Sequence, residues 1–165
     1  MLNVTKTNII PEICFNSKTA DFFGIGEICN ALTVRQPYAL MLVNGIKKYE
    51  YRSWELPWQL CQIEKSIPVF IHAGKQVMKE KVEITDDDYN KYLAEAKEQD
   101  LFGCILGAVF FGKPQKHTNG YAWPVEVSLR FDFPARDVKG WQKIWQFKMC
   151  TEAGGCGNGN HVVKY

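Results

Sequence analysis

The charged residues that follow Gly45 have types and spacing that suit either catalysis or ligand binding. Lys47, Glu50 and Arg52 stand close together, and aromatic residues alternate with them. A lysine can assist a nucleophile and a glutamate can move protons, whereas an arginine offers phosphate a planar fork of donors. The same charges would also make a structural ion pair inside the fold, since buried charges are usually paired. Both interpretations stay open from these residues alone.

A short apolar helix is predicted to position the start of this stretch. Residues 39–43 are apolar on every side, which indicates a helix enclosed by the rest of the fold. Pro37 suits its first turn, and Asn44-Gly45 suits its end. Arg35 and Gln36 then stand at the helix start, where free N–H groups attract anions. We therefore count both residues as candidate ligand contacts.

A strand is predicted from Gly45 to about Trp54. Alternation places Glu50 and Arg52 on one face, so they can contact the same ligand or each other. The same alternation places Lys47 opposite Glu50, unless the helix cap turns the chain. Lys47 is a candidate both for phosphate binding and, with Glu50, for catalysis.

A second strand, over residues 67–72, brings His72 and Lys75 to its end. A lone histidine there is more often a hydrogen-bonded core residue than a general base, and we keep His72 as a candidate ligand contact. Lys75 suits a phosphate contact as well as it suits solvent. A short polar helix is expected to follow.

Several aromatic residues near these positions have side chains that stack on bases in single-stranded RNA. Large aromatic residues are also the usual content of a core. The four candidates for stacking are Tyr38, Trp54, Trp58 and Trp123. We keep Tyr38 and Trp54 as candidate ligand contacts.

The remaining elements predict an α+β fold, a small β-barrel flanked by two or three helices, because short strands need their edges covered. Thr85 and Asp88 have the spacing of a capping box, which starts a helix through about Gln99. The other segments are strands at 103–111 and 123–133 and an aromatic segment at 140–145 that is either helical or a closing strand. We expect an N-terminal extension over residues 1–30, a domain over 31–147 and a flexible tail over 148–165.

Composition restricts the class of protein without defining it. The net charge is +2, so a basic cleft has to come from local clustering. The six cysteines include no C-x-x-C pair, and the chain has no signal-like start and no apolar run of ~18–20 residues, so we expect a cytoplasmic protein with no membrane partner.

No metal or other cofactor is expected. Asp86-Asp87-Asp88 fits a helix start, and Cys150, Cys156 and His161 supply three ligands where structural zinc usually takes four.

Two stretches resemble the ASCH domain family (activating signal cointegrator homology), which is related to the PUA RNA-binding barrel. They are ALTVRQPYAL at 31–40 and NGIKKYEYRSW at 44–54. The family pattern runs from a strand through R-Q-P-[WY] and a helix to G-x-K-x-x-E-x-R. IHAGK at 71–75, YAW at 121–123 and KGWQKIW at 139–145 resemble its later segments in the same order.

The resemblance implies a PUA-like barrel whose basic cleft binds RNA or a nucleotide-like ligand. Some members are similar to nucleic-acid-binding modules, and others hydrolyse an acylated pyrimidine nucleoside such as N4-acetylcytidine; ribonuclease action has been proposed for others. In small hydrolytic members a threonine nucleophile stands three residues after the lysine, and Glu50 stands there in this chain. We therefore expect binding of RNA, with hydrolysis of a modified nucleoside or of RNA as the alternative.

Overall fold

A computed structural model describes residues 10–61, 64–65, 67–152 and 162–163. The helices within these residues are α1 (Ser17–Phe23), α2 (Tyr38–Val43) and α3 (Asp86–Glu98), with a 3-10 turn, η1, at Trp58–Leu60. The strands are β1 (Ile10–Phe15), β2 (Ile28–Gln36), β3 (Tyr49–Arg52), β4 (Val69–Val77), β5 (Cys104–Phe111), β6 (Gln115–His117), β7 (Gly120–Ala135), β8 (Ile144–Thr151) and β9 (Val162–Val163). The predicted α+β class with three helices is confirmed.

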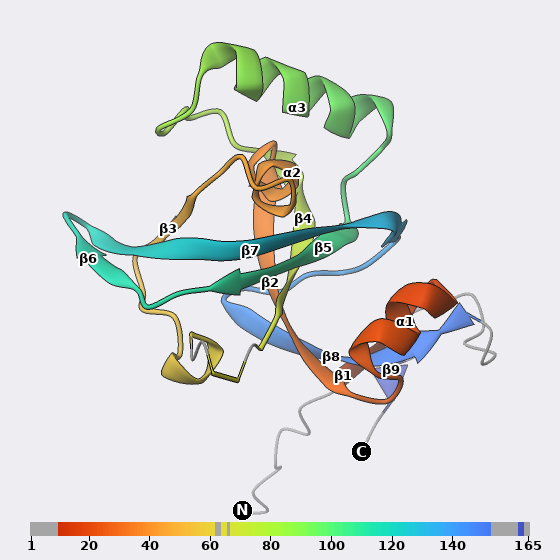
Figure 1. Cartoon of the computed structure of the whole chain (residues 1–165). Coiled ribbons are helices and arrows are strands. Elements are labelled where there is room, and N and C mark those ends of the chain that lie inside the picture. Colours follow the sequence, from red (N-terminus) through yellow and green to blue (C-terminus); the bar gives the residue numbers. More distant parts are fainter. Residues whose placement is uncertain (1–9, 62–63, 66, 153–161, 164–165) are drawn as a thin grey trace, which may run out of the picture.

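One mixed sheet joins the described strands in the order β3-β7-β5-β4-β2-β8-β1-β9, with β6 also paired to β7 (Figure 1). The pairs β2–β4 and β1–β8 are parallel, and the other pairs are antiparallel. The first part of β7 pairs with β3 and β6, and its second part pairs with β5. Within the described residues this order does not return on itself, so the sheet is not closed into the predicted barrel. The short strand β3 ends the sheet instead.

Helix α2 lies at the centre of the larger hydrophobic core, as its apolar sequence predicts. All six of its residues are buried, and they pack against β2, β4, β5 and β7. The helix ends at Val43 with Asn44 as its C-cap, and Gly45 follows with a positive φ of 72°. Figure 1 shows α3 lying over α2. The buried side chains of α3 are Tyr89, Tyr92 and Ala96.

The first described residues form part of the same sheet. Strand β1 pairs in parallel with β8, and α1 packs beside them (Figure 1). Phe15 stacks on Phe147 and meets the edge of Phe70 in a second core cluster. Residues 10–30 of the expected extension are therefore built into the core.

Several boundaries differ from the sequence-based expectations. Strand β3 covers only Tyr49–Arg52 of the stretch predicted from Gly45 to about Trp54. Strand β4 continues to Val77, where a short helix was predicted, and Gln36 of β2 pairs with that residue. The aromatic segment becomes a strand only from Ile144, and β8 continues to Thr151, so residues 148–151 are strand rather than tail. Most of the predicted tail lies outside the described residues. None of the helices in the described part of the chain is both long and apolar enough to cross a membrane.

Candidate functional site

A pocket of about 520 Å³ opens between β2, β3 and two loops. We call it the charged pocket. It brings together six of the predicted site residues, which are Arg35, Tyr38, Lys47, Glu50, Arg52 and Trp54. The loops contribute Met78 and Val82 from one side and residues 141–143 from the other.

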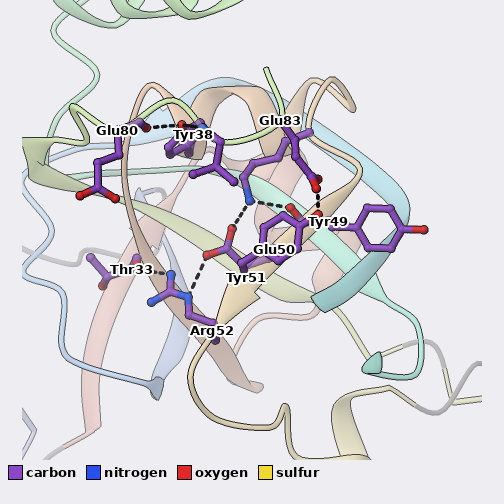
Figure 2. Close-up of polar contacts among 10 residues, drawn as sticks. Thr33, Tyr38, Tyr49, Glu50, Tyr51, Arg52, Glu80 and Glu83 are labelled. Carbon is purple, nitrogen blue, oxygen red and sulfur yellow. Dashed lines mark hydrogen bonds and ion pairs between the residues drawn. The ribbon is translucent and has the colours of Figure 1, made fainter. Parts of the chain in front are cut away.

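Glu50 holds the centre of the charged pocket. Its side chain is buried, and each carboxylate oxygen binds one cation (Figure 2). Lys47 Nζ lies 2.7 Å from Oε2, and Arg52 Nε lies 2.8 Å from Oε1. Alternation correctly predicted that Glu50 and Arg52 share a face of the strand.

The position of Lys47 corrects the simple alternation. The backbone N–H groups of Ile46 and Lys47 both donate to the carbonyl of Met41, at 3.0 and 3.2 Å. This double hydrogen bond turns the chain directly after α2. Lys47 therefore reaches Glu50 instead of facing away from it.

Further contacts fix the two cations. Lys47 Nζ also donates to the carbonyl of Tyr49 and lies 5.5 and 5.3 Å from the ring centroids of Tyr38 and Tyr51. Arg52 Nη2 donates to the carbonyl of Thr33 at 3.0 Å. Among the described residues, no group accepts a hydrogen bond from Arg52 Nη1. Arg52 therefore keeps free donors at the pocket.

The cations also determine the charge of Glu50. Burial alone would raise the pKa of this carboxyl, but the charges and hydrogen bonds of Lys47 and Arg52 outweigh it, so the pKa is lowered. Glu50 stays an anion with both oxygens occupied. It is consequently a weak candidate for a general base, and the cluster carries one net positive charge.

The pocket walls combine an exposed charge with hydrogen-bonded aromatic groups. Arg35 is exposed, and the contact of its guanidinium is Met78 Sδ at 3.9 Å. The Tyr38 hydroxyl donates to the carbonyl of Glu80 and accepts from Val82 N–H, so Tyr38 holds the loop that forms one wall (Figure 2). Tyr51 donates to a carboxylate oxygen of Glu83 in the same loop.

Trp54 is the pocket tryptophan that the sequence identified. It packs edge-to-face on Trp123, with centroids 4.8 Å apart. Trp123 is fully buried, and its indole nitrogen has no partner among the described residues. Trp58 is exposed but does not line the pocket. Of these three residues, only Trp54 can meet a ligand in the pocket.

Gln36 is a structural residue. It is completely buried, and its Nε2 donates to the carbonyl of Leu101 at 2.7 Å. Its Oε1 accepts from Leu40 N–H at 3.1 Å, which satisfies a free donor in the first turn of α2. Gln36 does not line the charged pocket, so the prediction that it contacts ligand lacks a geometric basis.

His72 is likewise held inside the fold. Its Nε2 donates to the carbonyl of Val138 at 2.8 Å, which makes Nδ1 the acceptor in a neutral ring. The Thr33 hydroxyl occupies Nδ1 at 3.1 Å and in turn accepts from Trp145 Nε1 at 3.1 Å. Burial lowers the pKa of His72 despite the bond to Val138. The core-residue alternative fits this histidine better than a general base.

Lys75 lies beside a second pocket of about 550 Å³, which we call the second hollow. Its walls include Gly74 and Gly103 and the loop residues 137–140. Thr33 and the loop 137–143 border both this hollow and the charged pocket. Lys75 is therefore a neighbour of the predicted site and lies outside it.

Sequence reasoning missed the contribution of Trp141, Gln142 and Lys143 to the charged pocket. Residues 139–145 were recognised only as a closing segment. Their alternation of lysine with tryptophan, in a stretch bounded by Gly140 and β8, is the signal that could have found them.

The acidic run at the start of α3 serves the helix. The Thr85 hydroxyl accepts from Asp88 N–H at 3.1 Å, and Asp86 pairs with Lys81 at 2.8 Å. Within the described residues, no three metal-ligating side chains gather at one point. Cys156 and His161 lie outside these residues.

A scan against protein-family models and a search of curated proteins both find no match to this chain. The chemistry of the site therefore has to be argued from its geometry. That geometry offers cationic donors and aromatic walls around a cavity of ligand size, with no unoccupied base at its centre.

Proposed function

We propose that this chain is an ASCH-like, PUA-related module that binds RNA through the charged pocket. A phosphate group would bind to Arg52, Arg35 and Lys143, and a base would lie against Trp54. The observation that carries the proposal is the Glu50 cluster. In it, Glu50 accepts a hydrogen bond from Arg52 Nε, and the Thr33 carbonyl accepts a second one from Nη2. These two bonds hold the guanidinium and leave Nη1 free beside a cavity of about 520 Å³.

Three physical arguments support this assignment. The cavity lies within the range of about 300–1,000 Å³ that is usual for ligand sites. An arginine fork fixed in advance loses little entropy when it binds phosphate. Phosphate contacts supply most of the affinity for nucleic acid, and a stacked base adds selectivity.

Binding can be tested with a fluorescently labelled single-stranded RNA and anisotropy at several salt concentrations. We expect log Kd to depend linearly on log salt, with a slope of about 0.7 for each phosphate contact. Arg35→Gln and Lys143→Gln should each weaken binding and reduce the slope. Arg136→Gln removes an arginine that binds the carbonyl of Asp100 away from the pocket and is the matched control. Salt-independent binding would overturn the proposal.

Hydrolysis of an acylated pyrimidine nucleoside, or of RNA, is the alternative activity. It would need Glu50 as a base or Lys47 as an assisting group, and in this structure the two are bound to each other. Incubation with N4-acetylcytidine, and with RNA in EDTA, separates the two functions. Release of cytidine or cleaved RNA that is lost in Lys47→Ala would establish an enzyme and overturn our preference for binding.

A further inference from the structure

The loop from Asp137 to Lys143 forms a ridge between the charged pocket and the second hollow. Residues 137–140 line the second hollow, and residues 141–143 line the charged pocket. The backbone enters and leaves this ridge at residues with positive φ, which are Asp137 at 57° and Lys143 at 56°. Such angles are costly for residues other than glycine and persist where the surroundings impose them.

Buried contacts hold the ridge in place. His72 Nε2 donates to the Val138 carbonyl, and Val138 N–H donates to the carbonyl of Gly103 at 2.8 Å. A side chain at Gly140 would have no room, because an added Cβ would lie 2.4 Å from both His72 Nδ1 and Thr33 Oγ1. His72 and Thr33 therefore position the ridge.

The fixed ridge presents an aromatic ring between cations. Trp141 is 42% exposed, although its ring lies 5.1 Å from that of buried Trp145. Lys139 Nζ lies 5.9 Å from the Trp141 ring centroid, and exposed Lys143 follows two residues later. A tryptophan held on a rigid loop with lysines on both sides suits a base and the phosphates on either side of it.

Positive charge is concentrated on the two cavities that the ridge separates. The acidic side chains that line them are Glu50 and Asp137. Six basic side chains line them, which are Arg35, Lys47, Arg52, Lys75, Lys139 and Lys143. This excess is larger than the net charge of +2 carried by the whole chain. The surface around the ridge is therefore the most favourable described region for a polyanion that spans both cavities.

We propose that the ligand is a single-stranded polynucleotide that crosses this ridge. This inference rests on the proposed function. One nucleotide occupies the charged pocket, the base of the next stacks on Trp141, and the following phosphate binds Lys139 and Lys75 in the second hollow. A duplex cannot bind in this way, because its bases are already paired and stacked on one another.

The deciding experiment measures anisotropy of labelled decauridylate over a range of salt concentrations, with a duplex RNA of the same length for comparison. The double variant Lys75→Gln/Lys139→Gln removes the charges of the second hollow only. It should lower the salt slope by about 0.7, because single strands lose about 0.7 for each phosphate contact and one phosphate binds both lysines. Lys91→Gln/Lys97→Gln, on α3, removes two lysines that line neither cavity and should leave the slope unchanged.

Trp141→Ala should weaken the binding of decauridylate by roughly tenfold, since stacking on an aromatic residue has about this effect for each base. Trp141→Phe should recover most of that loss. The duplex should bind at least tenfold more weakly than the single strand. Equal affinity for the duplex, or an unchanged affinity in Trp141→Ala, would overturn the proposal that a single strand crosses the ridge.

The same titrations separate this inference from the proposed function. If Arg35→Gln and Lys143→Gln weaken binding while the double variant behaves as wild type, the charged pocket binds RNA and no strand crosses the ridge. If wild-type protein does not bind decauridylate, both proposals fall. If the double variant weakens binding while the two pocket variants do not, the charged pocket is not the site and the crossing fails with it.

Discussion

Two buried polar clusters meet at Thr33. One compensates for burial with ion pairs, and the other does so with hydrogen bonds between uncharged groups. On one side, Glu50 forms ion pairs with both Lys47 and Arg52, and Arg52 also donates to the Thr33 carbonyl. On the other side, His72 and Trp145 bind the Thr33 hydroxyl with no formal charge. One residue of β2 thus serves both clusters.

The two clusters differ in the hydrogen-bonding groups that remain available to a ligand. In the neutral cluster, the indole N–H, the hydroxyl and both imidazole nitrogens have partners inside the protein. In the charged cluster, Arg52 keeps unused donors, and its side chain is 23% exposed. A residue type that often carries catalysis, such as His72, can therefore be purely structural, whereas an ion pair can still present a binding group.

The largest expected difference between the two clusters comes from removing the Glu50 carboxylate, which Lys47 and Arg52 share. Glu50→Gln leaves two cations close together in a buried site, so we expect a loss of about 3–5 kcal/mol in the free energy of unfolding. Urea denaturation measures it. Glu12→Gln is the matched control, since Glu12 pairs with Lys148 at 3.7 Å in a less buried position, and should cost less than about 1 kcal/mol. Equal losses would show that burial does not distinguish these two ion pairs.

The neutral cluster can be disturbed by adding one methyl group. Gly140→Ala places a Cβ against His72 and Thr33, and overpacking of this kind costs about 1–3 kcal/mol. Gly74→Ala is the control, because its Cβ would meet Thr33 Cγ2 at 3.4 Å. Thermal denaturation should show a clearly lower Tm for the first variant only. A normal Tm for Gly140→Ala would mean that the ridge adjusts freely.

The neutral cluster should also make the stability of the protein depend on pH through His72. Folding lowers the pKa of His72 from its ordinary 6.5, so the unfolded chain binds the proton more tightly. The stabilisation is complete above pH 6.5 and is lost as pH falls toward the folded-state pKa, by at most about 1.4 kcal/mol for each pH unit. His72→Gln should flatten this part of the stability profile. An unchanged slope of stability against pH in His72→Gln would contradict the assignment of this pH dependence to His72.

The smallest expected effect concerns the exposed cation of the pocket. Arg35→Gln removes a side chain whose polar contact is one sulfur atom, so the free energy of unfolding should change by less than about 0.5 kcal/mol. Urea denaturation is again the measurement. A loss above 1 kcal/mol would show that Arg35 stabilises the fold as Arg52 does. Arg35 could then no longer be separated from the charges that hold the fold together.

Local patterns predicted the centre of the site well. The apolar run of α2, its cap at Asn44-Gly45 and the shared face of Glu50 and Arg52 follow from neighbours in sequence. Alternation alone places Lys47 opposite Glu50, and the exception left open, a turn at the helix cap, is what the structure has. Two hydrogen bonds to the Met41 carbonyl make this turn and decide the direction of Lys47. Periodicity does not describe such a turn.

Features that depend on distant partners were not predictable. The role of Trp141 follows from a loop that His72 fixes from β4, and no local pattern records that contact. Strand β1 is stabilised by parallel pairing with β8, in which Glu12 faces Lys148. The same pairing explains why residues 148–151 are strand, although their composition resembles a tail.

The pairing of β8 also governs the order of events when the chain is synthesised. In the finished sheet β8 lies between β1 and β2, and Ala31 pairs with Trp145. Strand β1 therefore waits for β8 before it gains a neighbour on this side. Strand β2 can pair with β4 earlier, but its other edge also waits for β8. Contacts so far apart in sequence make folding slow, and unpaired strand edges are prone to aggregate in the meantime. A nascent chain that stops before Ile144 would expose the edges of both strands.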